Sequence, residues 1–289
     1  MSYIQQEIPP ISEDDLFIIL NHPDAKFDYA THFHSEYELN MVLNTKGKRI
    51  VGDSVETFTD FDLVLIGPNI PHAWRGEIIQ GNHVVTIQFH NQLLDFPILN
   101  KKMFALIKDL LQKSSRGVQF LENKNSSLCR KILNLPNLTG FNVSLEFLSL
   151  LYELASSPNQ RLLASNVFDS ESVVRESKSR RISKVCNFVN ANYMCPIKLP
   201  EIAAEINMSP SALSHFFKKR TSRNLIDYVN DIRLGYATKM LFETTHSINE
   251  IAFLCGFNNI ANFNRVFKKS KGQTPSEFRT DIHKILTKY

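Results

Sequence analysis

Residues 248–279 read INEIAFLCGFNNIANFNRVFKKSKGQTPSEFR, and a second version of this pattern lies about fifty residues upstream. Between residues 199 and 228, the apolar residues of a first segment match the later copy at an offset of 49. Those of a second segment match at an offset of 50, so one residue is inserted beside Gly256 and Phe257. In each copy the apolar positions of the first segment recur at i, i+3, i+4 and i+7, the spacing of a helix with one buried face. The pattern predicts two helices joined by a turn, present twice.

Capping residues set the expected helix ends. Ser209 before Pro210 is typical of a helix start, because Ser accepts from orphan amides and Pro needs no donor there. We therefore expect the second helix of the first copy at about residues 210–220. In the second copy we expect Asn258 to cap a helix over residues 259–270. Each copy is then a helix-turn-helix, whose second helix fits the DNA major groove.

The connecting segment and the charge both suit a DNA partner. Residues 225–241 have helical periodicity, and at 1.5 Å per residue they would span roughly 25 Å. The two second helices could then lie about one DNA turn, roughly 34 Å, apart. Residues 180–289 contain 17 Lys and Arg against 8 Asp and Glu, whereas the whole chain contains 33 and 29. This basic excess favours phosphate binding over the alternative of a merely solvated helical surface.

A longer signature runs through the second copy: I-A-x-x-x-G-F at 251–257, F-x-R-x-F-K at 263–268, G-x-T-P at 272–275 and F-R at 278–279. It resembles the AraC/XylS family of transcription regulators. The resemblance implies a DNA-binding domain over residues 180–289, RNA polymerase as a further partner, and activation as the commoner role. It also implies DNA contacts from Ser211, Ser214, His215 and Lys218 in the first copy, and from Ile260, Ala261, Asn262, Asn264, Arg265 and Lys268 in the second.

Three of these positions have distinct expected roles. Arg265 is the strongest candidate for base reading, because bidentate Arg–guanine pairing is the commonest specific contact. A salt bridge on the helix surface is the alternative for this residue. Ile260 and Ala261 cannot hydrogen-bond a base, but either could pack on a thymine methyl group.

The N-terminal part has a different texture, and the 289 residues suit two domains. Short strand-like runs at 38–44, 48–53, 62–67 and 83–89 are separated by Gly, Asp, Asn and Pro. Regularly spaced runs of this kind predict a β-sandwich or barrel.

Within these runs lie three histidines and a glutamate: His32, His34, Glu38 and His72. On a strand, residues two apart project from one face, so His32 and His34 would converge, and Glu38 rejoins them if the alternation continues. This H-x-H-x3-E segment with its later histidine resembles the cupin fold, in which such residues bind a divalent metal inside a small barrel. Three imidazoles and a carboxylate suit Fe, Mn, Ni or Zn. Hydrogen bonding to a metal-free effector, or a purely structural role, are the open alternatives.

The resemblance implies a small-molecule effector in this barrel, with sugars among the candidates. We expect it at His32, His34, Glu38, His72 and Trp74. Trp74 lies two residues beyond His72 and would share its face of a strand. Its ring could stack on a sugar or an aromatic effector, or it could be an ordinary core residue.

The expected architecture is multidomain: an all-β cupin-like barrel over residues 1–97, a helical region over 98–164, a linker over 165–179 and an all-α domain over 180–289. The family resemblance implies that the helices of 98–164 pack on the barrel and form a homodimer surface; the alternative is that they only complete the core. Residues 165–179 are polar, rich in serine and aperiodic, as linkers are.

Other features mainly exclude function classes. The four cysteines show no C-x-x-C spacing, the first thirty residues lack a signal-peptide pattern, and no apolar run approaches the 18 or so residues of a membrane span. We therefore expect a cytoplasmic, effector-controlled regulator that is not an enzyme and has no certain cofactor, with a divalent metal in the cupin-like barrel as an open alternative. The alternatives are a metal-dependent cupin enzyme fused to a DNA-binding module, and a DNA-binding protein whose degenerate barrel serves only dimerisation.

Overall fold

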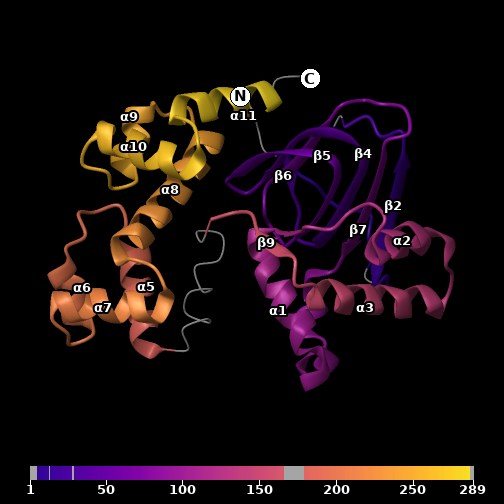
Figure 1. The fold of residues 1–289 in the computed structure, drawn as a ribbon, viewed down its shortest axis with the longest axis horizontal. Helices are drawn as coiled ribbons and strands as arrows, with labels where there is room; N and C mark the ends of the chain where they lie inside the picture. Colours follow the sequence, from indigo (N-terminus) through magenta and orange to yellow (C-terminus); the bar gives the residue numbers. More distant parts are fainter. Residues whose placement is uncertain (1–4, 13, 28, 166–178, 287–289) are drawn as a thin grey trace. The chain divides into compact units, whose positions relative to one another are not determined.

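The computed structural model describes residues 5–12, 14–27, 29–165 and 179–286 (Figure 1). The chain divides into two compact units, one over residues 3–164 and the other over residues 165–289. Most of the expected linker, residues 166–178, lies outside the described residues.

Within the described residues, nine strands of the N-terminal unit form one sheet: β1 Gln5–Gln6, β2 Phe17–Pro23, β3 His32–Phe33, β4 Tyr37–Val51, β5 Ser54–Ile66, β6 His72–Gly76, β7 His83–Phe89, β8 Val118–Phe120 and β9 Gln160–Leu162. The long strand β4 is its centre. Its first half pairs with β7, its second half pairs with β6, and β5 runs along both halves. The pairing of the described strands does not close into a ring, so the expected barrel is an open sheet that curls around its interior (Figure 1).

Two details of this sheet differ from the sequence prediction. The separate runs 38–44 and 48–53 form the single strand β4, which passes through an irregularity between Leu43 and Lys46 instead of a turn. Asn44 accommodates it with a positive φ of 56°, a conformation that Asn tolerates better than most residues. Strands β8 and β9 come from the region expected to be helical and extend the sheet beyond β5.

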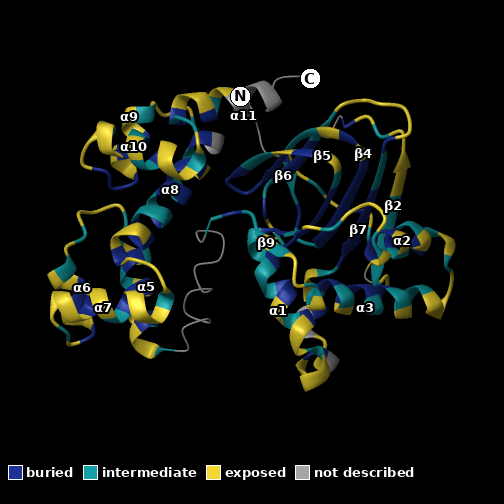
Figure 2. Ribbon diagram, viewed as in Figure 1, coloured by how far each residue is buried: buried dark blue, intermediate teal, exposed yellow. Residues whose placement is uncertain are grey.

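Three helices cover one face of the sheet: α1 Ala105–Lys113, α2 Ser127–Asn134 and α3 Phe141–Ser156. Short 3-10 turns lie at Asn91–Asp95, Pro97–Asn100, Lys102–Phe104, Ser114–Arg116 and Leu135–Asn137. Alternate residues of β4 and β7, such as Leu39, Met41 and Ile87, pack with helix residues such as Leu110 and Phe147 in a buried core (Figure 2). Because successive residues of a strand point to opposite faces, the intervening residues of β4 and β7 face the interior of the curled sheet.

The C-terminal unit consists, in its described residues, of seven helices: α5 Arg180–Asn192, α6 Leu199–Glu205, α7 Pro210–Thr221, α8 Leu225–Glu243, α9 Ile248–Leu254, α10 Ile260–Lys271 and α11 Pro275–Leu286. The pairs α6–α7 and α9–α10 confirm the repeated helix-turn-helix, and α8 confirms the connecting helix. Buried residues such as Ile202, Phe217 and Tyr228 form the core of the first pair. In the second pair, Phe263 and Phe267 are fully buried.

The two turns share one hydrogen-bond pattern. The Met208 amide donates to the Ala203 carbonyl in the first unit, and the Phe257 amide donates to the Ala252 carbonyl in the second, both at 2.9 Å. The inserted residue is Asn258, which lies between Phe257 and the helix cap. The expected cap Asn258 is therefore wrong by one position, since Asn259 accepts from the Asn262 amide at 2.8 Å and α10 starts at Ile260.

Two further observations concern the whole described chain. No helix within it is both long and apolar enough to cross a membrane. Its four cysteines are free, with Cys129, Cys186 and Cys255 buried and Cys195 exposed.

Candidate functional site

The residues expected to contact DNA lie on the outer faces of α7 and α10. All four of the first unit are exposed: Ser211, Ser214, His215 and Lys218. In the second unit Ala261, Asn262, Arg265 and Lys268 are exposed, while Ile260 and Asn264 are half-buried. Both helices turn their buried residues to the opposite side, so each presents a polar strip to solvent.

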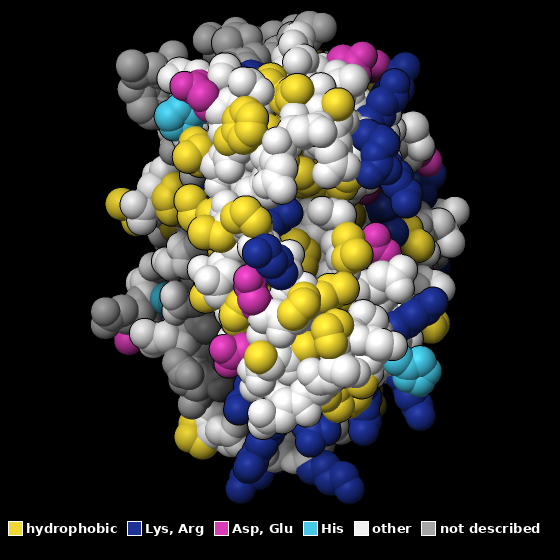
Figure 3. Space-filling model, turned by 90° about the vertical axis from the view of Figure 1, so that its left-hand side faces the viewer, with side chains coloured by type: hydrophobic (Ala, Val, Ile, Leu, Met, Phe, Trp, Pro, Cys, Tyr) yellow, Lys and Arg dark blue, Asp and Glu magenta, His cyan; other side chains and the backbone are white. Residues whose placement is uncertain are grey.

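Charge accompanies these strips. The last turn of α7 contains Lys218, Lys219 and Arg220, and the last turn of α10 contains Lys268, Lys269 and Lys271. On the face of the molecule shown in Figure 3, Lys and Arg side chains gather along one edge and at the lower end. Arg265 donates from Nη2 to Oδ1 of Asn262 at 2.9 Å, one turn earlier on the same helix. The acceptor is a neutral amide oxygen and not a carboxylate, so a base edge could replace it.

In the N-terminal unit, the structure brings together the three histidines and the glutamate predicted from the sequence. One ligand atom from each of His32, His34, Glu38 and His72 lies within 4.8 Å of the others. His32 lies on β3 directly opposite His72 on β6. His34 follows β3 outside any strand, and Glu38 lies on β4, so the turn between them, rather than continued alternation, brings the carboxylate to the imidazoles.

Each imidazole of this cluster has its Nδ1 at a backbone carbonyl oxygen. The distances are 2.9 Å from His32 to Ala30, 3.1 Å from His34 to Glu36 and 2.7 Å from His72 to Ile70. A carbonyl only accepts, so each Nδ1 carries a proton and each Nε2 is turned to the cluster. This is the ring orientation in which a metal-ligating histidine offers Nε2.

The Nε2 atoms meet carboxylates. Oε2 of Glu38 lies 3.1 Å from Nε2 of His34 and 3.6 Å from Nε2 of His72, and it also accepts from Gln88. Burial opposes ionisation of Glu38, but the neighbouring His72 and the His34 hydrogen bond hold its pKa well below the ordinary range. Burial lowers the pKa of His72. The cluster thus combines an ionised carboxylate with nitrogen donors, a set that fits a divalent transition metal.

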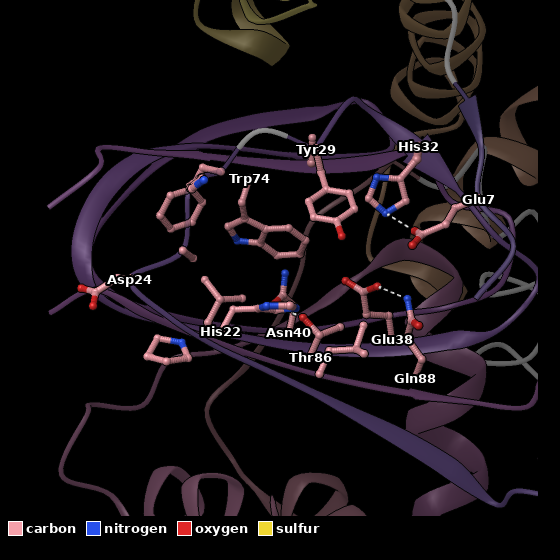
Figure 4. Close-up of a pocket in the computed structure, with 17 residues that line it drawn as sticks. Glu7, His22, Asp24, Tyr29, His32, Glu38, Asn40, Trp74, Thr86 and Gln88 are labelled. Carbon is pink, nitrogen blue, oxygen red and sulfur yellow. Dashed lines mark hydrogen bonds and ion pairs between the residues drawn. The ribbon is translucent and has the colours of Figure 1, made fainter. Parts of the chain in front are cut away.

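A pocket of about 360 Å³ adjoins the cluster and lies inside the curled sheet. Figure 4 shows Trp74, Tyr29 and His32 on one wall and Asn40, Thr86, Gln88 and Glu38 on the facing wall. The facing wall consists of the interior residues of β4 and β7. An aromatic wall opposite a row of amide and hydroxyl groups suits a small ligand with one apolar face and several polar groups.

The predicted effector residues divide into two groups. His32, Glu38 and Trp74 line the pocket, whereas His34 and His72 belong to the cluster but are not among the lining residues. A hydrogen bond fixes the orientation of the Trp74 ring, because its Nε1 donates to the buried Asp62 at 2.8 Å.

Sequence reasoning missed several lining residues, including Glu7, Tyr29, Asn40, Thr86 and Gln88. The alternation of H-V-V-T-I-Q-F over β7 was a usable signal, because its polar Thr86 and Gln88 occupy positions that face away from the helices. No comparable signal marks Glu7.

Known proteins resemble the chain in ways that agree with this geometry. A family model described as a helix-turn-helix domain matches residues 202–281. The uncharacterized HTH-type transcriptional regulator YpdC of Escherichia coli (strain K12) is 27% identical over 244 residues, which cover 79% of this chain and 84% of that protein. The HTH-type transcriptional activator RhaR of Escherichia coli O139:H28 is 22% identical over 254 residues, which cover 87% of each.

Among solved structures, a probable AraC family transcriptional regulator from Rhodopseudomonas palustris has a TM-score of 0.34 and 24% identity, and the match covers 36% of this chain and 98% of that one. The range of the helix-turn-helix match contains both repeated units of the C-terminal domain. The chain is a transcription regulator with an AraC-type DNA-binding domain at its C-terminal end.

Proposed function

We propose that the chain reads two successive major grooves of DNA and that a small effector in the N-terminal pocket controls this binding. The observation that carries the proposal is that one chain contains two helix-turn-helix units with exposed polar strips and, in a separate compact unit, a pocket lined by polar groups. A module that only bound DNA would have no use for that pocket.

The DNA contacts come from the exposed strips of α7 and α10. Ser211, Ser214 and His215 read bases in the first groove, and Ile260, Ala261, Asn262, Asn264 and Arg265 read the second. Lys218 and Lys268 neutralise phosphates, which adds affinity without adding sequence information. The 19 residues of α8 would span about 28 Å, which suits sites about one helical turn apart.

Selection of bound duplexes from a random library tests this arrangement. We expect two enriched sequence blocks with centres about 10 bp apart. A single enriched block would show that only one unit reads bases, and the absence of any enriched sequence would overturn base reading altogether.

The effector acts by preferring one of the conformations or dimer arrangements in which the DNA-binding domain exists, since a ligand shifts an equilibrium only by its differential affinity. We propose an activator that works as a homodimer with RNA polymerase, in line with the relative that is named an activator. His32, Glu38 and Trp74 contact the effector directly, and His34 and His72 hold Glu38.

Thermal unfolding of the full chain against sugars, sugar acids and aromatic acids tests the effector proposal. A ligand that binds the folded state raises the midpoint. Thr86→Val removes a hydroxyl from the pocket wall and should weaken the affinity for the effector about tenfold. Thr59→Val changes an exposed hydroxyl of β5 and should leave that affinity unchanged. If no ligand raises the midpoint, the pocket has no effector among these classes.

The orientation of the three imidazoles favours a second candidate function, divalent metal binding by His32, His34, Glu38 and His72. A metal there would supply Lewis acidity beside the pocket. Metal analysis of the purified chain, together with turnover assays on the same ligands, separates three readings. Metal with turnover would favour an enzyme, metal without turnover would favour a metal-assisted sensor, and neither metal nor effector would leave a unit that serves only dimerisation.

A further inference from the structure

The N-terminal strand places a second carboxylate beside the histidine cluster. The Gln5 amide donates to the Thr31 carbonyl at 3.1 Å, and the Glu7 amide donates to the Phe33 carbonyl at 2.9 Å. These bonds continue the parallel pairing of β1 with β3, in which Gln5 lies opposite His32, and fix the backbone of Glu7 beside Phe33. Oε2 of Glu7 then lies 2.9 Å from Nε2 of His32, and the side chain of Glu7 lines the pocket (Figure 4).

Glu7 contacts Nε2 of His32, whereas a carboxylate that only oriented a ligating histidine would contact the other nitrogen, Nδ1. Nδ1 of His32 already faces the Ala30 carbonyl, so Glu7 meets the nitrogen that the cluster would offer to a metal. Glu7 and Glu38 are therefore alike, since each places a carboxylate oxygen against an Nε2 atom.

The distances between these atoms are those of neighbouring ligands around one ion. Ligand atoms about 2.1 Å from a metal lie about 3.0 Å apart at right angles and about 3.6 Å apart at 120°. The pairs here are 2.9 Å for Glu7 with His32, 3.1 Å for Glu38 with His34 and 3.6 Å for Glu38 with His72.

We propose that Glu7 is a fifth protein ligand of a divalent metal held by His32, His34, Glu38 and His72. The inference rests on the metal-binding function proposed above. In the structure Glu7 meets the cluster through His32 alone, so the proposed ligation requires its carboxylate to turn from Nε2 of His32 toward the other three residues. Two carboxylates neutralise a dication in this largely buried site, whereas Glu38 alone leaves an uncompensated positive charge.

A cobalt(II) titration of the full chain, followed by visible absorption and calorimetry, tests this assignment. The variants are Glu7→Gln and the matched control Glu36→Gln, whose carboxylate lies 3.9 Å from His34 on the Nδ1 side, away from the cluster. We expect Glu7→Gln to weaken binding at least about tenfold and to change the cobalt spectrum. Glu36→Gln should keep the spectrum and bind within about threefold of the wild type.

Hydrogen exchange of the Gln5 and Glu7 amides gives a second measurement that does not depend on the affinity for cobalt. Cobalt should slow both amides in the wild type and in Glu36→Gln but not in Glu7→Gln, because a ligated Glu7 ties β1 to β3. Tight cobalt binding by Glu7→Gln, or unchanged exchange in the wild type, overturns Glu7 as a ligand while the four-residue site stands. No binding by any form overturns both, and leaves DNA reading and effector control to their own tests.

Discussion

The two helix-turn-helix units have the same backbone plan but different local stabilisation. At the turn, the first unit places Asn207 at a φ of 52°, and the second places Gly256 at 81°. At the end of the second helix, Ser222 adopts the left-handed conformation in the first unit and Gly272 adopts it in the second. The second unit thus uses glycine where the backbone requires a positive φ, and the first uses residues that tolerate it at a cost.

Helix starts differ in the same direction. In the second unit α9 has a capping box of Ser247 and Glu250, and the start of α11 has the same reciprocal bonds between Thr274 and Glu277. In the first unit the described caps of α6 and α8 make no side-chain cap bond. The second unit is therefore encoded more strongly by local sequence, and the first depends more on packing against α5.

Substitution of the turn residues should give the largest difference in stability between the two units. Gly256→Ala would place a Cβ 2.1 Å from the Tyr193 carbonyl oxygen at a positive φ, so we expect a loss of at least about 3 kcal/mol. Asn207→Ala should cost only about 1 kcal/mol, the difference between Asn and Ala in the left-handed region. Urea unfolding followed by far-UV circular dichroism measures both.

The single tryptophan supplies the control for this experiment. Trp74 lies in the N-terminal unit, so its fluorescence transition should be the same in both variants and the wild type. Equal losses for the two variants would show that the turns are under the same constraint, against the geometry.

Substitution of the equivalent residues of the two recognition helices should have the next largest effect. Arg265→Ala should weaken binding to the selected duplex by about 1–3 kcal/mol, because Arg can bond a guanine with two donors, and should affect nonspecific binding much less. His215→Ala, at the matching position of α7, should cost about 1 kcal/mol or less, since one imidazole makes one such bond. Gel-shift titration against specific and random duplexes gives both values.

The exposed Arg181 of α5 offers a matched control, because Arg181→Ala removes a charge outside the recognition helices. If Arg265→Ala loses the same free energy on all duplexes, Arg265 contacts phosphate and not a base.

Local patterns explain what the sequence predicted. The cap at Ser209 and the helices around Phe217 and Phe267 follow from residues within one or two turns of each other. The grouping of His32, His34, Glu38 and His72 was also predictable, because it needs only short spacings and one later strand. Glu7 was not, since its place depends on pairing β1 with a segment 27 residues later, and two-residue strands leave no periodicity.

The same limit applies to β8 and β9, whose three residues each are too few to show alternation. The open sheet also departs from the barrel that the family resemblance implied, because closure depends on pairing between distant strands. The roles of the DNA-contact, effector and metal residues stay predictions.

Substitution of the residues at the two helix ends should change the stability of the two units by a smaller amount and in opposite directions. Ser222→Gly should stabilise the first unit by about 0.5–1 kcal/mol, because glycine adopts the left-handed conformation without steric cost. Gly272→Ala should destabilise the second by about 1 kcal/mol through conformation alone, since a Cβ there would meet nothing within 4 Å. The same unfolding assay measures both, and opposite signs are the expected result. A destabilising Ser222→Gly would mean that the Ser222 side chain contributes more than its strained conformation costs.

The capping boxes predict the smallest difference, an acid sensitivity confined to the second unit. The hydrogen bond from the Ser247 amide lowers the pKa of Glu250 from its ordinary value of 4.5, and that from the Thr274 amide lowers the pKa of Glu277 in the same way. A carboxyl whose pKa is lower in the folded state stabilises that state above the unfolded pKa, and the contribution is lost as the pH falls through the folded pKa. Acidification from pH 5 to pH 3 should therefore loosen α9 before α6.

The NMR amide signals of Ala252 in α9 and Ala203 in α6 report on the two helices. Glu250→Gln should remove the change at Ala252, because glutamine keeps the capping box without the charge. An Ala203 signal that moves with Ala252 would show that both units respond to acid through a shared cause, and the capping boxes would not account for it.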